Sequence, residues 1–305
     1  MPIGVRRAFE ALVRSGGADL EAFLLRNHER LAKELQLAAG RDGLGSARRL
    51  DRRLAEVARS EPSDQMRRAA IARLALGLAK RLPTLPWPTS VKSLYPKAFE
   101  TLSGALLDGS AYDPDFYAKD ARFVAGATVP AGGQILDVVF PRGLAASGHR
   151  LLRLAANVGR LALTGDIDAA IELARSRGWK PWLEVHTEQR SLANFNEPGW
   201  DAVYKRAADI LADRPDLAGL WGASWFYDPQ LEAVSPHLTY LRRRPIERGA
   251  ILVRLGRDPY QTRLAMQASS TRRAQIESGR YRPACFAIFW PRKSLLAWAS
   301  DVAPV

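Results

Sequence analysis

The sequence predicts an α+β protein, in which a helical N-terminal region is followed by an α/β-like part with a mixed sheet flanked by helices. Apolar residues recur at helical spacing between residues 4 and 82, for example Val5, Phe9, Leu12 and Val13. After residue 133, short apolar runs typical of strands alternate with helical patterns, the order expected when helices cover one sheet. Between the two parts, the segment PTLPWPT at 83–89 contains three prolines and cannot continue a helix.

These patterns divide the chain into three predicted parts. Residues 1–82 form a helical N-terminal region, residues 83–120 a linker rich in proline and aromatic residues with one helix, and residues 121–305 a mixed-sheet α/β domain. The last part carries the candidate site. Strands are predicted at 134–140, 179–188, 217–227, 250–255 and 284–290. Helices of the same part are predicted at 143–162, 166–177, 196–213, 235–244 and 258–279.

The positive charge of the chain is uneven. The 305 residues carry a formal net charge of +13, of which +10 falls in residues 239–293. The cations are mostly arginine, a bias that a GC-rich bacterial genome produces without functional selection. Arg242, Arg243 and Arg244 lie in the last turn of a predicted helix, where cations complement the helix dipole. A few of the remaining arginines, near the last two predicted strands, are expected to serve an anionic ligand. Nucleic acid is not favoured, since no compact Lys/Arg run is interleaved with exposed aromatic residues.

The composition also indicates the compartment. No apolar stretch approaches the roughly 20 residues that a membrane-spanning helix needs. Cys285 is the one cysteine, so an internal disulfide is excluded. We therefore expect a soluble, cytoplasmic protein.

The segment Glu184-Val185-His186-Thr187-Glu188 is the sharpest candidate for a catalytic site. On a strand, residues 184, 186 and 188 point to the same face because side chains alternate. One carboxylate can orient the imidazole, and a second can act as a base or a ligand. We therefore predict Glu184, His186 and Glu188 as catalytic residues. The alternative interpretation is a strand end that emerges into solvent.

His186 and Glu188, together with the distant His237, also match the outline of a metal site with two histidines and one carboxylate. This pattern resembles the 2-oxoglutarate-dependent iron oxygenases, in which an arginine, here Arg248, binds the cosubstrate. The resemblance implies an alternative function, a metal-dependent oxygenase with Fe(II) bound by His186, Glu188 and His237.

Two segments that follow predicted strands combine aromatic and polar side chains, as the pockets for small ligands do. Asn194 and Asn196 belong to the first segment, and Trp225, Tyr227 and Asp228 belong to the second. Both segments are expected at the same sheet edge as the candidate catalytic segment. We predict that these five residues bind the substrate. The alternative interpretation is ordinary capping of turns and helices.

Arginines near the last two predicted strands are candidates for binding the phosphate of a donor or cofactor. They are Arg254, Arg263, Arg272 and Arg273. The segment Ser269-Ser270-Thr271 places hydroxyl groups beside two of these guanidinium groups, a combination that suits an anion. The alternative interpretation is a solvated helix face.

A helix that ends in glycine, followed by an aromatic residue and a strand, is predicted in the stretch TRRAQIESGRYRPACFAIFW. This stretch, and the order of strands and helices in residues 217–290, resemble the C-terminal part of the GCN5-related N-acetyltransferases. The resemblance implies a thioester donor, either coenzyme A or an acyl carrier, and in the second case an acidic carrier protein as partner. The leading hypothesis is an enzyme that transfers an acyl or aminoacyl group to a small amine, which Glu184, His186 or Glu188 deprotonates. The other alternative is a non-enzymatic protein that binds an anion or nucleic acid.

Overall fold

The structure is a computed structural model that describes residues 1–39, 44–139, 181–267 and 269–302, with isolated positions between 158 and 174. The chain divides into two compact units, Met1–Ala131 and Gly132–Val305. The helices predicted at 143–162 and 166–177 lie outside the described residues, apart from those isolated positions. The predicted fold class is confirmed, because helices precede a mixed sheet that is flanked by helices. Within the described part of the chain, no helix has the length and apolar character needed to cross a membrane.

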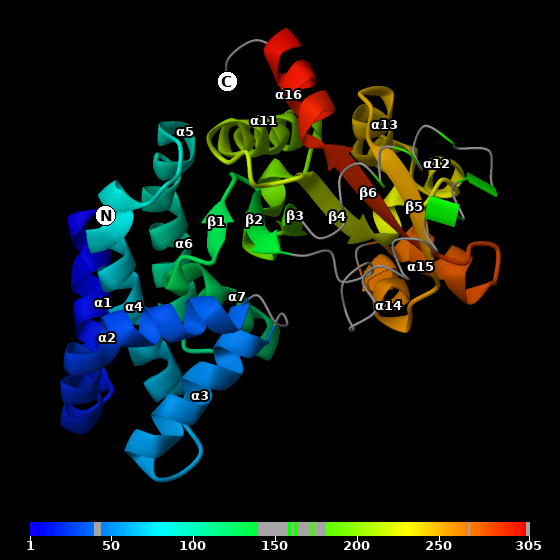
Figure 1. The fold of residues 1–305 in the computed structure, drawn as a ribbon. Coiled ribbons are helices and arrows are strands. Elements are labelled where there is room, and N and C mark those ends of the chain that lie inside the picture. The colour runs from blue at the N-terminus through cyan, green and yellow to red at the C-terminus, as the bar shows by residue number, and fades with distance from the viewer. Residues whose placement is uncertain are drawn as a thin grey trace. The chain divides into compact units, whose positions relative to one another are not determined.

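The first unit is built from helices (Figure 1). These are α1 (Ile3–Ser15), α2 (Ala18–Ala39), α3 (Gly45–Ala58), α4 (Asp64–Arg81), α5 (Thr89–Lys92), α6 (Tyr95–Leu107) and α7 (Pro114–Ala125), followed by the short strand β1 (Thr128–Pro130). α1 packs against α4, α2 packs against α3, and α7 packs against all three of α2, α3 and α4. The compact unit therefore includes the predicted linker region and ends at Ala131.

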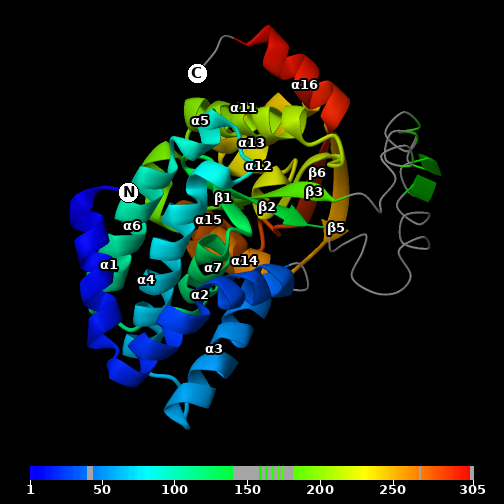
Figure 2. The same ribbon diagram turned by 60° about the vertical axis from the view of Figure 1, so that its left-hand side comes forward.

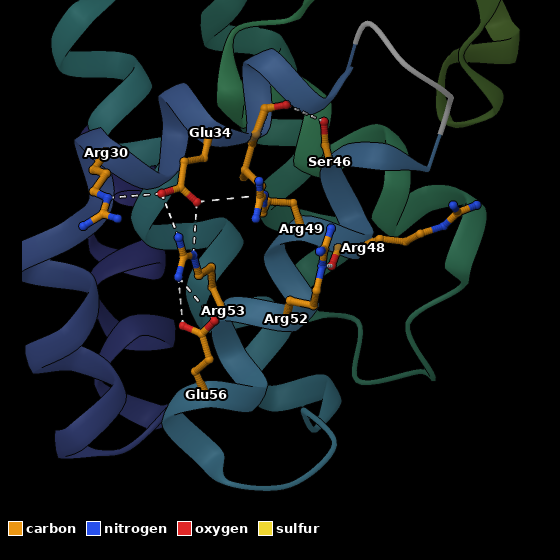
Figure 3. A network of polar contacts seen from close by, with 9 residues as sticks. Arg30, Glu34, Ser46, Arg48, Arg49, Arg52, Arg53 and Glu56 are labelled. Carbon is orange, nitrogen blue, oxygen red and sulfur yellow. Dashed lines mark hydrogen bonds and ion pairs between the residues drawn. The ribbon is translucent and has the colours of Figure 1, made fainter.

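An ion-pair network joins α2 to α3 (Figure 3). Glu34 accepts a hydrogen bond from Arg30 at 3.1 Å and two from Arg53 at 3.0 and 3.1 Å. Arg53 also contacts Glu56 at 3.0 Å, and Arg49 lies 4.0 Å from Glu34. Although burial raises the pKa of Glu34, the hydrogen bonds and charges of Arg53 and Arg30 lower it overall. Part of the positive charge of this unit is thus neutralised between its own helices.

The second unit is built on a mixed sheet whose strands follow the order β2-β3-β4-β6-β5. The strands are β2 (Gln134–Val139), β3 (Trp182–Thr187), β4 (Gly219–Ser224), β5 (Ile251–Gly256) and β6 (Cys285–Pro291). β3 and β4 pair in parallel, whereas the pairs β2/β3, β4/β6 and β5/β6 are antiparallel. β3, β4 and β5 therefore run in the same direction. We call the edge where these three strands end the carboxyl edge.

Helices cover one face of this sheet. α11 (Glu197–Asp213) and α16 (Arg292–Asp301) pack side by side (Figures 1 and 2). Tyr204 of α11 and Trp298 of α16 both pack on Trp290 of β6, with ring centroids 5.2 and 5.3 Å away. These aromatic contacts fix the two helices on the sheet.

The opposite face carries an apolar cluster that continues into polar residues. Trp182 and Trp221 pack on Phe289, with ring centroids 5.4 and 5.7 Å away. All three side chains are almost fully buried. Because side chains alternate along a strand, the same face of β3 continues from Trp182 to Glu184 and His186. Glu184 and His186, two of the predicted catalytic residues, therefore lie on the face opposite α11 and α16.

The connections after β4 and β5 form a second small core. They comprise the 3-10 turns η3 (Trp225–Tyr227) and η4 (Pro236–Leu238) and the helices α12 (Leu231–Val234), α13 (Tyr240–Glu247), α14 (Pro259–Gln267) and α15 (Ser270–Glu277). The centre of this core consists of Trp225, Leu231, Ala265 and Tyr281. It lies beside the carboxyl edge, since η3 directly follows β4.

Three predicted elements have different limits in the structure. The strand predicted at 217–227 ends at Ser224, because the next three residues form η3. The helix predicted at 258–279 is two helices, since the Ser269 side chain accepts a backbone N–H and caps α15. The helix predicted at 235–244 begins as the turn η4, and α13 then continues through Pro245 to Glu247. α16 was not predicted.

Gly219 is required where β4 approaches its neighbours. A Cβ atom there would lie 2.2 Å from the Trp290 carbonyl oxygen and 2.7 Å from the Trp182 ring. We expect Gly219→Ala to lower the free energy of unfolding by about 1–3 kcal/mol, measured by chemical denaturation. Gly104→Ala in α6 is the control, because nothing lies within 4 Å of its Cβ position. Equal stabilities of the two variants would contradict this account.

Candidate functional site

A histidine and two carboxylates meet on the sheet face opposite α11 and α16. Glu184 and His186 lie two residues apart on β3, and Asp137 of β2 pairs in register with Glu184. Registered partners and alternate residues share a face, so the three side chains point the same way. The His186 Nε2 atom lies 3.1 Å from Asp137 Oδ2 and 3.6 Å from Glu184 Oε2. We call this group the Asp137–Glu184–His186 cluster.

The three members of the cluster differ in their access to solvent. The side chain of Asp137 is 2% exposed, that of Glu184 is 13% exposed and that of His186 is 31% exposed. The Nε2 atom of His186 is itself buried, so the exposed part of the ring lies away from this atom. Asp137 can therefore position the ring, whereas Glu184 and the outer part of His186 can touch a ligand.

The cluster favours a charged imidazole. Burial alone would lower the pKa of His186, but the charge of Glu184 and a hydrogen bond to Asp137 outweigh it and raise this pKa to about 9. At neutral pH the ring is therefore an imidazolium ion beside two carboxylates. Such a group can attract a cation through its carboxylates.

The raised pKa of His186 predicts a pH dependence of stability. Because the pKa is higher in the folded state than the unperturbed 6.5, the stabilisation is fully present below pH 6.5 and is lost as the pH rises through about 9. We expect the stability difference between the wild type and His186→Gln to shrink over this range, measured by chemical denaturation at several pH values. A difference that stays constant or grows with pH would contradict the ion pairing.

Of the three predicted catalytic residues, the structure brings Glu184 and His186 together but separates Glu188. The Glu188 side chain accepts a hydrogen bond from the backbone N–H of Arg190 at 3.0 Å and so caps the turn η2 (Gln189–Asn194). Asp137 was missed by the sequence analysis. Its one signal is a carboxylate among the apolar residues of the strand QILDVV.

The alternative set of metal ligands does not come together. In residues 1–39, 44–139, 181–267 and 269–302, no group of three or more His, Cys, Asp or Glu side chains is placed to hold a metal ion. His237 lies exposed in η4, and Glu188 is a cap. Arg248, the expected cosubstrate ligand, lies 4.0 Å from Asp301. The described residues therefore do not form the site that an Fe(II) oxygenase needs.

The two aromatic segments do meet at the carboxyl edge, as the sequence predicts. The ring centroid of Phe195, after β3, lies 5.9 Å from that of Phe226, after β4. Trp200, at the start of α11, lies 5.8 Å from Phe195 and 6.1 Å from Phe226. The parallel pairing of β3 and β4 explains this contact, because both strands end on the same side.

The predicted substrate-binding residues have mainly structural contacts at this edge. The Asn196 side chain caps α11 by accepting a backbone N–H at 2.9 Å, while Asn194 is exposed beside it. Trp225 and Tyr227 are buried in η3. Asp228 is buried too and accepts a backbone N–H just before β6 at 2.9 Å. Asn194 and Asn196 thus remain the exposed members of this set.

Arg272 is enclosed in the small core beside the carboxyl edge. Its side chain is 2% exposed and its guanidinium carbon lies 4.2 Å above the Trp225 ring. The guanidinium group donates to the Ser235 hydroxyl at 3.0 Å and to the Ala265 carbonyl at 2.6 Å. These contacts give Arg272 a structural role and do not favour its predicted role in phosphate binding.

Two other predicted phosphate ligands lie together at the surface. Arg263 and Arg273 line a depression of about 550 Å³, and Arg257 lines it with them. Its walls come from the two residues that follow β5, from α14 and from α15. Arg254 is exposed on β5 and is not part of this lining. We call this feature the arginine depression.

The arginines of α13 are paired with carboxylates. Arg242 and Arg243 both contact Glu232, the second at 3.3 Å. Arg244 contacts Glu197, and it lies 3.2 Å from Asp201. The charge of these three residues is thus balanced within the fold.

Comparisons with known proteins give distant likenesses to solved structures. No family model matches the chain, and no curated protein matches it. An acyltransferase in complex with decanoyl-CoA is 13% identical, with a TM-score of 0.48 over 76% of this chain and 69% of that one. An acyltransferase in complex with CoA and 10C-teicoplanin is 12% identical, with a TM-score of 0.47 over 74% of this chain and 66% of that one. The chain thus spans about two thirds of the length of these structures. At this level of similarity, the function rests on the geometry of the site.

Proposed function

We propose that the second unit transfers an acyl group from a thioester to a small amine, as an acyltransferase of the GCN5-related type. The observation that carries this proposal is the Asp137–Glu184–His186 cluster, in which the His186 Nε2 atom lies 3.1 Å from Asp137 and 3.6 Å from Glu184 on one sheet face. Two of its members are accessible, and it lies on β3 close to the carboxyl edge. The carboxyl ends of parallel strands are the usual place for ligands in sheets covered by helices.

The charge of the cluster suits an amine acceptor. An amine reaches the site as an ammonium ion, and the carboxylates outnumber the one imidazolium that faces them. Glu184 accepts a proton from the ammonium ion and passes it to solvent, which leaves a neutral amine nitrogen. General base assistance of this kind contributes roughly 100- to 10,000-fold to a rate.

His186 acts on the donor in this proposal. The amine nitrogen attacks the thioester carbonyl carbon, a C–N bond forms and the C–S bond breaks. The imidazolium donates a proton to the departing sulfur and regains one from the nitrogen, so the products are an amide and a free thiol. A ring that is charged at neutral pH is suited to this donor role.

The pairing of β3 with β4 supports the binding of an extended thioester donor near the carboxyl edge. β3 and β4 pair in register only at Leu183–Leu220 and Glu184–Trp221, although both strands continue toward the carboxyl edge. An extended arm with amide groups, such as pantetheine, binds along strand ends through main-chain hydrogen bonds. The Trp221 ring, in register with Glu184, is almost fully buried on Phe289, so it backs the sheet face next to Glu184 with apolar packing. We infer that the donor is coenzyme A or an acidic acyl carrier protein.

The experiment is amine-dependent thiol release by the full chain. Acyl-CoA thioesters of several chain lengths and aminoacyl thioesters are mixed with a set of small primary amines. Free thiol is measured with a thiol reagent, and the amide is identified by mass spectrometry. We expect thiol and amide in equal amounts and only when an amine is present. Absence of amide with every thioester and amine would overturn the proposal, and so would thiol release that does not depend on the amine.

A further inference from the structure

We propose that the first unit docks on an anionic lipid surface through a set of residues that we call the α2–α3 basic face. This face consists of five cations and two exposed leucines around the junction of α2 and α3. They are Arg30, Lys33, Leu37, Leu44, Arg49, Arg52 and Arg53. Because the face belongs to the first unit, its binding is independent of acyl transfer by the second unit and can be tested without it.

The residues of the face come together because α2 and α3 pack on each other. The Ser46 hydroxyl, at the start of α3, donates to the Leu35 carbonyl near the end of α2 at 2.9 Å. Arg30, Lys33 and Leu37 neighbour one another on α2, since residues three and four apart are adjacent on a helix surface. Cations and a leucine of α2 therefore lie side by side, next to the beginning of α3.

Three guanidinium groups of the face lie within 4.0 Å of the Glu34 carboxylate (Figure 3). They belong to Arg30, Arg49 and Arg53, and Arg53 also pairs with Glu56. Two carboxylates therefore meet three guanidinium groups inside this network. One positive charge of the network is left over.

Lys33 and Arg52 add two further cations beside this network. Both are exposed, and neither forms an ion pair with any residue that the structure describes. Lys33 lies three residues after Arg30, and Arg52 lies three residues after Arg49, so each neighbours a member of the network on its own helix. The five cations of the face are thus in contact with only two carboxylates. Near an anionic membrane surface, each such cation strengthens binding about fivefold.

The two leucines of the face are exposed to solvent. Leu37, in the last turn of α2, is 71% exposed, and Leu44, directly before α3, is 42% exposed. Leu37 follows Arg30 by two helical turns, so both lie on the same side of α2. Interfacial helices combine side chains in this way, with apolar groups that enter the lipid boundary and long cations that bind the headgroup phosphates. The leucines therefore favour a lipid surface over a soluble polyanion.

The test is co-sedimentation of the full chain with lipid vesicles of two compositions. One kind contains phosphatidylcholine alone, and the other contains equal parts of phosphatidylcholine and phosphatidylglycerol. We expect binding to the anionic vesicles that weakens with added salt, and no binding to the neutral vesicles. Lys33→Gln/Arg52→Gln is expected to weaken this binding about tenfold or more, because it removes two cations that have no partner in the fold. Leu37→Ser is expected to weaken it about threefold or more, because less apolar surface enters the lipid.

Each variant has a matched control that we expect to bind like the wild type. Arg280→Gln/Arg282→Gln removes the same charge from two exposed arginines of the second unit. Leu25→Ser changes a leucine that is 53% exposed on the same helix, but its position twelve residues before Leu37 turns it about 120° away from the face.

Three results would overturn lipid docking. The first is no binding to anionic vesicles, or equal binding to both kinds of vesicle. The second is an equal loss of binding in a variant and its control. The third is a loss with Lys33→Gln/Arg52→Gln but none with Leu37→Ser, which would indicate an acidic protein as the partner of this face.

Discussion

Glu184→Gln is expected to lower the rate of acyl transfer about 100- to 10,000-fold while the fold is kept. The substitution preserves the shape of the side chain but removes the carboxylate that lies 3.6 Å from His186 Nε2. Two effects add together. The amine loses its proton acceptor, and the pKa of His186 falls because the charge of Glu184 no longer raises it. Steady-state kinetics with an acyl-CoA and an amine acceptor measure the change.

Glu188→Gln is the matched control for this prediction. It removes the same charge from the same segment, but Glu188 caps η2 and is not part of the cluster. We expect kcat/KM of this variant to stay within about threefold of the wild type, since removal of a cap affects stability by about 1 kcal/mol. If Glu188→Gln were as inactive as Glu184→Gln, the cluster would not be the site of proton transfer.

The largest expected effect on stability belongs to Arg272→Ala. This substitution removes a buried side chain that packs on Trp225 and donates to the Ser235 hydroxyl and the Ala265 carbonyl. A cavity remains, and two buried acceptors lose their donor. We expect a loss of about 3 kcal/mol or more in the free energy of unfolding, measured by chemical denaturation.

Arg273→Ala is the control for Arg272→Ala. The two arginines are adjacent in sequence, but Arg273 is exposed, so its removal is expected to change stability by at most about 0.5 kcal/mol. Arg272→Lys keeps the charge but loses the flat stacking surface on Trp225, and we expect an intermediate loss. Equal stabilities of Arg272→Ala and Arg273→Ala would show that the contacts of Arg272 do not hold the small core together.

The positions of the five strands of the second unit follow from the sequence because each is a short apolar run between helical patterns, whereas β1 was not predicted. Strand ends were less predictable. Trp225, Phe226 and Tyr227 have the aromatic character of a strand, yet they form the turn η3, and Trp225 and Phe226 pack into the small core. The break between α14 and α15 rests on the side chain of Ser269, which caps the second helix. At the end of β4 and between α14 and α15, tertiary packing and capping therefore decided the structure, and the apolar periodicity of the sequence did not.

The candidate site was partly predictable. The alternation rule placed Glu184 and His186 on one face, because both lie on one strand. Asp137 lies on another strand, and only the register of β2 against β3 brings it beside Glu184. Glu188 obeys the alternation rule in the sequence, but β3 ends at Thr187, so the rule no longer applies to it.

The roles of the arginines also could not be assigned from the sequence alone. Arg272 and Arg273 are adjacent, and nothing in the sequence distinguishes them. The start of α15 turns Arg272 into the small core and leaves Arg273 at the surface with Arg257 and Arg263. Neighbouring residues of a helix point in different directions, and which of them is buried can be assigned only when the packing of that helix is known.

The central claim is that acyl transfer takes place at the Asp137–Glu184–His186 cluster. A crystal structure of the full chain with coenzyme A and the amide product would test it most directly. The account predicts the thiol of coenzyme A and the amide nitrogen within hydrogen-bond reach of the outer part of the His186 ring and of Glu184. A complex in which both molecules lie elsewhere, with the cluster in contact with neither, would contradict it.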